Sequence, residues 1–215
     1  KGNTVIENAA KEPEIDALAK FLTKMGAKID GAGTDRIEIE GTDELHPTNE
    51  TIIPDRIETG TYISAAVITG GNIIIKKSNL DHLSFVLTKF EEAGIKISIK
   101  NSDITVESPE ELKPINVTTT PYPGFPTDMQ ALWTALMSVT IGTTIVKDTV
   151  YYDRFNHVPE LKRLGADIQV ENNSAIIKGV KELKGAPVMS TDLRASASLI
   201  IAGLAAKGRT DVLRV

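Results

Sequence analysis

The sequence predicts an α/β fold made of repeated units of about seventy residues, in which helices alternate with short strands. A glycine that ends an amphipathic helix and leads into an alternating strand occurs at three places, Gly26, Gly94 and Gly165. An acidic residue at an expected helix start also occurs at three places, Asp55, Asp128 and Asp192. Both landmarks recur with similar spacing, so each unit reads helix, strand, second helix and three further strands.

Hydrophobic periodicity locates the helices. Apolar residues three and four positions apart form a stripe in each of three segments, 15–25, 83–90 and 129–136. Met129 and Trp133 lie on the third stripe, so we expect both in the core. The alternation in "IKISI" and "ADIQV" predicts strands after the second and third of the glycines.

The repeat divides the chain into two complete units, 55–120 and 121–189. The end of another unit precedes them, and the start of a further one, 190–215, follows. A solenoid of simple repeats is the competing interpretation, but these units are long and irregular beside common solenoid repeats.

Composition narrows the class of partner. The 215 residues carry a formal net charge of −5, which gives no electrostatic support to a nucleic-acid or anionic-membrane partner. The chain has no cysteine, so it holds no disulfide, thiolate metal site or cysteine nucleophile. The longest uncharged run, residues 129–146, is too polar for a transmembrane helix, and the chain opens on a strand-like segment rather than a signal peptide. These features predict a cytoplasmic protein.

The histidines give no sign of a metal site. The chain has three, His46, His82 and His157, and their spacing fits no metal-ligand pattern. His157 directly precedes the helix-like "VPEL", so we expect it to make a hydrogen bond at that helix start.

The segment "TTTPYPGFPTDMQALW", residues 118–133, fixes a helix entrance with three prolines and a glycine. Thr127 and Gln130 fit a capping box, and Asp128 lies in the first turn, where negative charge is favoured. Asp128 is therefore either a stabilising charge at a helix start or a catalytic group that the rigid loop positions.

Arginines at helix starts indicate an anion partner. Arg56 and Arg194 lie in first helical turns, where the helix dipole disfavours a cation by roughly 0.3–1 kcal/mol. Either a neighbouring carboxylate, Asp55 or Asp192, or a bound anion could offset that penalty. Arg154, in the aromatic loop "YYDRFNHVPEL" after a strand, is a further candidate for anion binding.

Four stretches together resemble one enzyme family. They are "VIENAAKEPEIDALAKFLTKMGAKIDGAGTDRIEIEG" with its continuation "TIIPDRIETGTY", "PYPGFPTDMQALW", "YYDRFNHVPELKRLGADI" and "STDLRASASLIIAGL". They are similar to the UDP-N-acetylglucosamine enolpyruvyl transferases, and the resemblance covers the whole chain. It implies an inside-out α/β barrel, in which βαβαββ units place helices inside and small sheets outside. Residues 1–53 would end the first domain, and 54–215 would form most of the second.

The same resemblance implies roles for individual residues. Asp128 would be the general base at the sugar 3-hydroxyl. Thr127 and Val150 would line the UDP-N-acetylglucosamine site, and Arg154 and Arg194 would hold phosphoenolpyruvate. The reaction, the first committed step of peptidoglycan synthesis, would need no metal or cofactor. Arg56 would have a structural role.

The resemblance also implies that about half an active site lies in this chain. The family's N-terminal lysine, its proton-donating cysteine loop and its last phosphate-binding arginine have no counterpart here, so we expect the chain alone to be inactive and to need the N-terminal half. Two alternatives remain: a 3-phosphoshikimate enolpyruvyl transferase-like enzyme, and a non-catalytic repeat or binding protein. The second would be favoured if Asp128, Arg154 and Arg194 did not meet.

Overall fold

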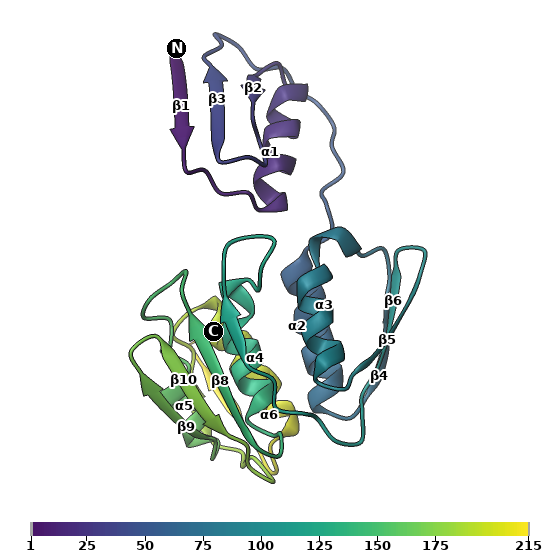
Figure 1. Cartoon of the computed structure of the whole chain (residues 1–215), viewed down its shortest axis with the longest axis vertical. Helices are drawn as coiled ribbons and strands as arrows, with labels where there is room; N and C mark the ends of the chain where they lie inside the picture. Colours follow the sequence, from purple (N-terminus) through teal and green to yellow (C-terminus); the bar gives the residue numbers. More distant parts are fainter. Residues whose placement is uncertain (1, 215) are drawn as a thin grey trace. The chain divides into compact units, whose positions relative to one another are not determined.

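The computed structural model describes residues 2–214, which form two compact units (Figure 1). The first unit comprises residues up to 54 together with 121–123. Its elements are β1 (Asn3–Glu7), α1 (Pro13–Lys24), β2 (Lys28–Asp30) and β3 (Arg36–Glu40). The three strands form an antiparallel sheet in the order β1-β3-β2, and α1 packs beside β2. Gly26 ends α1 with φ +106°, as its place after the amphipathic stripe predicts.

The second unit comprises residues 55–120 and 124–215. Its helices are α2 (Arg56–Ile68), α3 (Ser84–Glu92), α4 (Gln130–Met137), α5 (Val158–Arg163) and α6 (Leu193–Ala205), with short 3₁₀ helices η1 (Leu80–His82) and η2 (Thr127–Met129). Its strands are β4 (Asn72–Ile75), β5 (Lys96–Lys100), β6 (Asp103–Glu107), β7 (Val117–Thr119), β8 (Thr143–Asp148), β9 (Asp167–Glu171), β10 (Ser174–Lys178), β11 (Pro187–Met189) and β12 (Asp211–Leu213).

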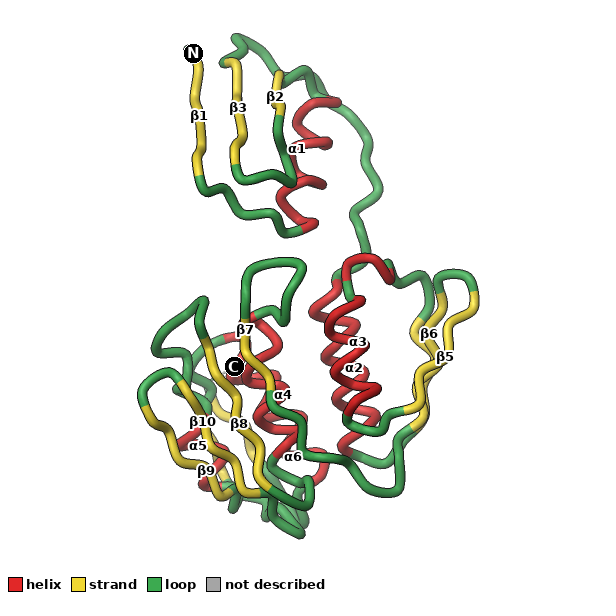
Figure 2. Tube along the Cα trace, in the orientation of Figure 1, coloured by secondary structure: helices red, strands yellow, loops and turns green. Residues whose placement is uncertain are grey.

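Helices occupy the inside of this second unit and sheets its outside (Figure 2). The helices α2, α4 and α6 pack against one another, and every residue of α4 is buried. The β4-β6-β5 sheet contacts α2, and the β7-β8-β10-β9 sheet contacts α4. The α/β fold with helices inside is therefore confirmed for this unit.

Strand pairing links consecutive repeats. β7 follows the β5–β6 hairpin of one repeat, yet it pairs in parallel with β8 of the next. β11 does the same with β12, again in parallel. The last strand of each of these two repeats, 55–120 and 121–189, thus pairs with the first strand of the next.

Trp133 is the largest fully buried side chain of the core. Its ring centroid lies 5.3 Å from that of Phe90 and 5.5 Å from that of Phe125, so it joins α3 to the proline-rich loop. Its Nε1–H donates to the carbonyl of Ile115 at 3.0 Å, which satisfies the indole in the core. The expectation that Trp133 and Met129 are core residues is confirmed.

Two of the three acidic landmarks are helix caps. The Asp55 carboxylate accepts from two backbone N–H groups at the start of α2, and the Asp192 carboxylate does so at the start of α6. The capping box predicted at Thr127 and Gln130 is wrong. Thr127 and Asp128 lie in η2, α4 begins only at Gln130, and neither helix start has a side-chain cap.

His157 also differs from its expectation. It occupies the N-cap position of α5 but makes no capping hydrogen bond with its side chain. The imidazole is 2% exposed and its Nε2 has no hydrogen-bond partner among the residues that the structure describes. It packs instead near the ring of Phe155, with centroids 6.3 Å apart. The His157 side chain is therefore a buried core group and not a helix cap.

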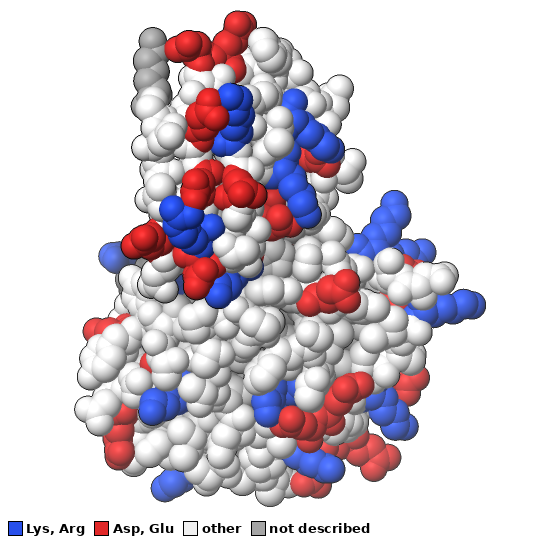
Figure 3. Space-filling view, turned by 45° about the horizontal axis from the view of Figure 1, so that its top comes forward, with Lys and Arg blue, Asp and Glu red and all other residues white. Residues whose placement is uncertain are grey.

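Charged side chains of both signs are interspersed on the face shown in Figure 3. That distribution agrees with the modest net charge of −5. Within residues 2–214, no helix combines the length and the apolar character that crossing a membrane requires.

Candidate active site

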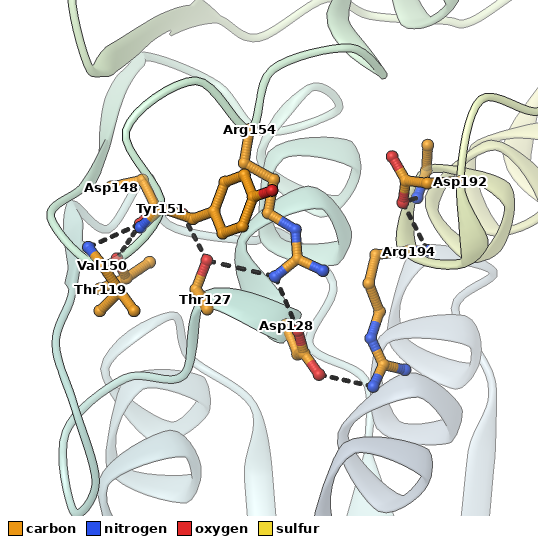
Figure 4. Close-up of polar contacts among 10 residues, drawn as sticks. Thr119, Thr127, Asp128, Asp148, Val150, Tyr151, Arg154, Asp192 and Arg194 are labelled. Carbon is orange, nitrogen blue, oxygen red and sulfur yellow. Dashed lines mark hydrogen bonds and ion pairs between the residues drawn. The ribbon is translucent and has the colours of Figure 1, made fainter. Parts of the chain in front are cut away.

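The Asp128 carboxylate lies between two guanidinium groups (Figure 4). Its Oδ1 is 2.7 Å from Nη1 of Arg154, and its Oδ2 is 2.6 Å from Nη2 of Arg194. The three residues come from η2, from the loop after β8 and from the first turn of α6. Residues distant in sequence thus meet at one point of the second unit, as an anion site requires.

The negative charge that offsets the helix-start position of the Arg194 side chain is that of Asp128, across the site, and not that of the neighbouring Asp192. Its backbone N–H donates to Asp192 Oδ1 at 2.8 Å, because that carboxylate caps α6. The guanidinium group extends instead to Asp128. The interpretation that the neighbouring Asp192 is the ion partner of the Arg194 side chain is therefore wrong. Arg56, the first residue of α2, is 8% exposed.

Arg154 is oriented from two further directions. Its Nη1 lies 3.3 Å from Oγ1 of Thr127, and its guanidinium carbon lies 5.6 Å from the centroid of the Tyr151 ring. Because Nη1 carries two hydrogens, it can donate to Thr127 and to Asp128 together. The side chain is 23% exposed, so one part of it faces solvent.

Thr127 and Val150 both contact Asp148, a residue that the sequence interpretation missed. The Thr127 hydroxyl donates to Asp148 Oδ2 at 2.6 Å, and the Val150 N–H donates to Asp148 Oδ1 at 3.0 Å. Val150 itself is 44% exposed, so its side chain is available to a ligand. A signal was present: in "TTIVKD" the aspartate falls at an inward-facing position of an alternating strand.

Asp128 is ionised at neutral pH. Burial works to raise the pKa of its carboxyl group, but hydrogen bonds and charge from Arg194 and Arg154 outweigh burial and hold that pKa below its ordinary value. A carboxylate in this state accepts a proton poorly. An anion that drew the arginines away would raise its pKa and make it a better base.

The site combines a carboxylate with cationic groups that can hold an anionic ligand. Forked guanidinium groups suit carboxylate and phosphate oxygens, and a carboxylate beside them can take a proton from a nearby hydroxyl. Among residues 2–214, no group of histidines, aspartates and glutamates is arranged to hold a metal ion.

The chain belongs to the EPSP synthase (3-phosphoshikimate 1-carboxyvinyltransferase) family, whose match covers residues 1–215. Among curated relatives, it is 54% identical over 215 residues to the UDP-N-acetylglucosamine 1-carboxyvinyltransferase of Myxococcus xanthus (strain DK1622). It is 59% identical over 215 residues to the protein of the same name from Chloroherpeton thalassium (strain ATCC 35110 / GB-78). The resemblance drawn from the sequence motifs is confirmed, since 1-carboxyvinyl and enolpyruvyl name the same group.

These alignments cover 100% of this chain but only 51% and 50% of the two relatives. The chain therefore spans about half the length of the curated relatives that it matches. Among solved structures, the enolpyruvyl transferase NikO from Streptomyces tendae superposes with a TM-score of 0.84 at 28% identity, covering 98% of this chain and 51% of that one. EPSP synthase from Acinetobacter baumannii, with a TM-score of 0.71 at 20% identity over 99% of this chain and 53% of that one, shows the shared fold alone.

Proposed function

We propose that this chain is about half of a UDP-N-acetylglucosamine 1-carboxyvinyltransferase. The whole enzyme would transfer the enolpyruvyl group of phosphoenolpyruvate to the 3-hydroxyl of UDP-N-acetylglucosamine, the first committed step of peptidoglycan synthesis, in the cytoplasm. The names of relatives that are 54% and 59% identical over the full chain support this substrate pair over shikimate 3-phosphate.

One observation carries the assignment within the chain: the Asp128 carboxylate is bonded to both Arg154 and Arg194. A non-catalytic repeat protein gains little from these contacts, because solvent reaches both ion pairs and such pairs add little to stability. The reaction gains from them, because it needs a base for the sugar hydroxyl beside cations for a multiply charged anion.

The proposed roles follow from that arrangement. Phosphoenolpyruvate binds the guanidinium groups of Arg154 and Arg194, and this binding breaks their ion pairs with the Asp128 carboxylate. Asp128 then accepts the proton of the sugar 3-hydroxyl as that oxygen bonds to carbon 2 of phosphoenolpyruvate, while carbon 3 gains a proton. Loss of a proton from carbon 3 and of inorganic phosphate from carbon 2 then restores the double bond. Thr127 and Val150 border the sugar site. The proton for carbon 3 comes from outside this chain.

The proposal also assigns residues 1–53 to the end of one domain and 54–215 to most of another. We infer that the N-terminal half of the whole protein supplies the remaining catalytic groups, so neither half is sufficient.

The test is phosphate release from phosphoenolpyruvate in the presence of UDP-N-acetylglucosamine, by a protein of the relatives' full length that contains this chain. We expect turnover with UDP-N-acetylglucosamine and none with shikimate 3-phosphate. The reverse preference would overturn the proposed substrate while leaving the family intact.

A further inference from the structure

Asp148, the last residue of β8, is a fully buried carboxylate with a defined set of donors. Its Oδ1 accepts from the Thr119 hydroxyl at 2.6 Å and from the N–H groups of Val150 and Tyr151 at 3.0 and 2.8 Å. Its Oδ2 accepts from the Thr127 hydroxyl at 2.6 Å. All four donors are uncharged. Ionised groups are costly to bury, and these hydrogen bonds offset that cost.

The Thr127 hydroxyl transmits this arrangement to Arg154. A hydroxyl has one hydrogen, and a carboxylate can only accept, so the hydrogen of Thr127 points at Asp148. The lone pairs of the same oxygen are then left to face Nη1 of Arg154 at 3.3 Å. Through this hydrogen bond, Asp148 fixes which side of the Thr127 hydroxyl oxygen is open to the guanidinium group of Arg154.

The backbone contacts act on the same arginine by a second route. Asp148 binds the first turn of the loop that carries Arg154, through the N–H groups of Val150 and Tyr151. The ring of Tyr151 in turn lies against the guanidinium group. Asn173 fixes the backbone of Asp148 itself, since its side chain donates to the Asp148 carbonyl at 2.9 Å.

We propose that Asp148 is a positioning residue, which holds Arg154 in place for phosphoenolpyruvate through the Thr127 hydroxyl and the Val150–Tyr151 backbone. This inference rests on the proposed function, because it takes phosphoenolpyruvate as the ligand of Arg154. Asp148 touches no reacting atom and takes no proton from the substrate.

The experiment compares Asp148→Asn with wild type in the whole protein that contains this chain. An asparagine has the same shape, and the three donors that face Oδ1 place its amide oxygen there and its NH₂ group towards Thr127. The amide nitrogen cannot accept the Thr127 hydrogen, so the hydroxyl turns and Arg154 loses Thr127 as an acceptor. We expect the KM for phosphoenolpyruvate to rise roughly 10-fold with a much smaller change in kcat, as the loss of one buried hydrogen bond predicts. An unchanged KM in a folded Asp148→Asn protein would overturn the proposal.

A matched pair at Thr127 guards against loss of folding in the Asp148 variant. Thr127→Ser keeps the hydroxyl and should retain the KM for phosphoenolpyruvate within about 2-fold, whereas Thr127→Val removes it and should raise that KM roughly 10-fold. Equal KM values for the serine and valine variants would also overturn the proposal.

Thr119→Val distinguishes positioning from stability. It removes one donor from Oδ1 of the same carboxylate but leaves the Thr127 hydroxyl and the Val150 and Tyr151 N–H groups, which carry both routes to Arg154, in place. We expect a lower melting temperature with the KM for phosphoenolpyruvate unchanged. If Thr119→Val raises that KM as much as Asp148→Asn does, the role of Asp148 is structural.

Failure of the proposed function is separable from failure of this inference. If the wild-type protein transfers no enolpyruvyl group, the proposed function fails. The inference is then decided by titrating phosphoenolpyruvate against the side-chain ¹⁵N resonance of Arg154. A dissociation constant roughly 10-fold weaker in Asp148→Asn supports it, and equal constants reject it.

Discussion

A carboxylate shared by two guanidinium groups is the feature on which the chemistry of this chain depends. The side chains of Asp128, Arg154 and Arg194 are 34, 23 and 25% exposed, so solvent reaches both ion pairs. Ion pairs open to water contribute little to stability. The arrangement is therefore better explained by ligand binding than by folding.

The first prediction separates a helix-start charge from a general base at Asp128. Asp128→Asn should cost less than about 1 kcal/mol of folding free energy, because both ion pairs are partly exposed. In the whole enzyme it should lower kcat about 10²–10⁴-fold, because an amide cannot accept the hydroxyl proton. Melting temperature and kcat are measured on the same preparation, with Asp167→Asn, an exposed residue of β9, as the control. A near-normal kcat would remove Asp128 from the chemistry.

The second prediction concerns His157 and acid. Burial, reinforced by Arg154 and opposed by Asp192, lowers the pKa of this imidazole from 6.5 to about 4. The folded protein therefore holds it neutral where the unfolded chain is already protonated. Its contribution to stability is complete above pH 6.5 and is lost as the pH falls towards 4, by about 3 kcal/mol in all.

His157→Phe tests that prediction, because phenylalanine fills the site without titrating. Urea unfolding at pH 7 and pH 4 should show a larger loss of stability in wild type than in the variant, with the difference approaching about 3 kcal/mol. Parallel losses in the two proteins would mean that His157 does not control acid sensitivity.

At the scale of helices and strands, local signals were sufficient wherever a position suits few residue types, as a positive φ suits glycine and a helix N-cap suits aspartate. Gly94 and Gly165 end α3 and α5 at φ +94° and +92°, and Asp55 and Asp192 cap α2 and α6, all as the pattern predicts. Thr127 was misjudged, because its best acceptor, Asp148, lies in a strand 21 residues away. Spacing in the sequence indicates hydrogen-bond partners within one element, but it gives no information about a partner in a distant element.

The third prediction compares two glycines of the β8–β10 region. A Cβ at Gly179 would lie 1.6 Å from the Thr140 carbonyl oxygen, whereas one at Gly165 meets no atom within 4 Å. Gly179→Ala must displace backbone and should cost roughly 2–4 kcal/mol. Gly165→Ala adds only the strain of a left-handed alanine, about 1 kcal/mol. Urea unfolding of both variants decides the order, and equal costs would contradict it.

At the scale of the whole molecule, the family and fold were predictable from motifs and repeats, whereas the meeting of Asp128 with Arg154 and Arg194 was implied by the family resemblance and not by residue patterns alone. Those residues were chosen singly, from a rigid loop, an aromatic loop and a helix start. The packing of α4 against α6 brings Asp128, just before α4, to Arg194 in the first turn of α6. Their roles, and the division of the chain into parts of two domains, stay predictions.

The fourth prediction is that this chain alone has no transferase activity. The proposed chemistry needs a proton donor and a further phosphate ligand that its 215 residues do not supply. Phosphate release from phosphoenolpyruvate and UDP-N-acetylglucosamine should stay at the uncatalysed level with this chain and appear with the whole protein. Turnover by the chain alone at a rate typical of enzymes, about 1–10³ per second, would refute this account of its catalytic groups.

The parallel pairing of β7 with β8 and of β11 with β12 means that a repeat of this chain is not a self-contained folding unit. Residues 121–189 take the edge strand of their sheet, β7, from the repeat before them. Excising residues 55–120 would remove that strand and leave the backbone of β8 unpaired along one edge, open to pairing with another chain. A piece of this protein cut at the sequence boundary of a repeat would therefore be prone to aggregate.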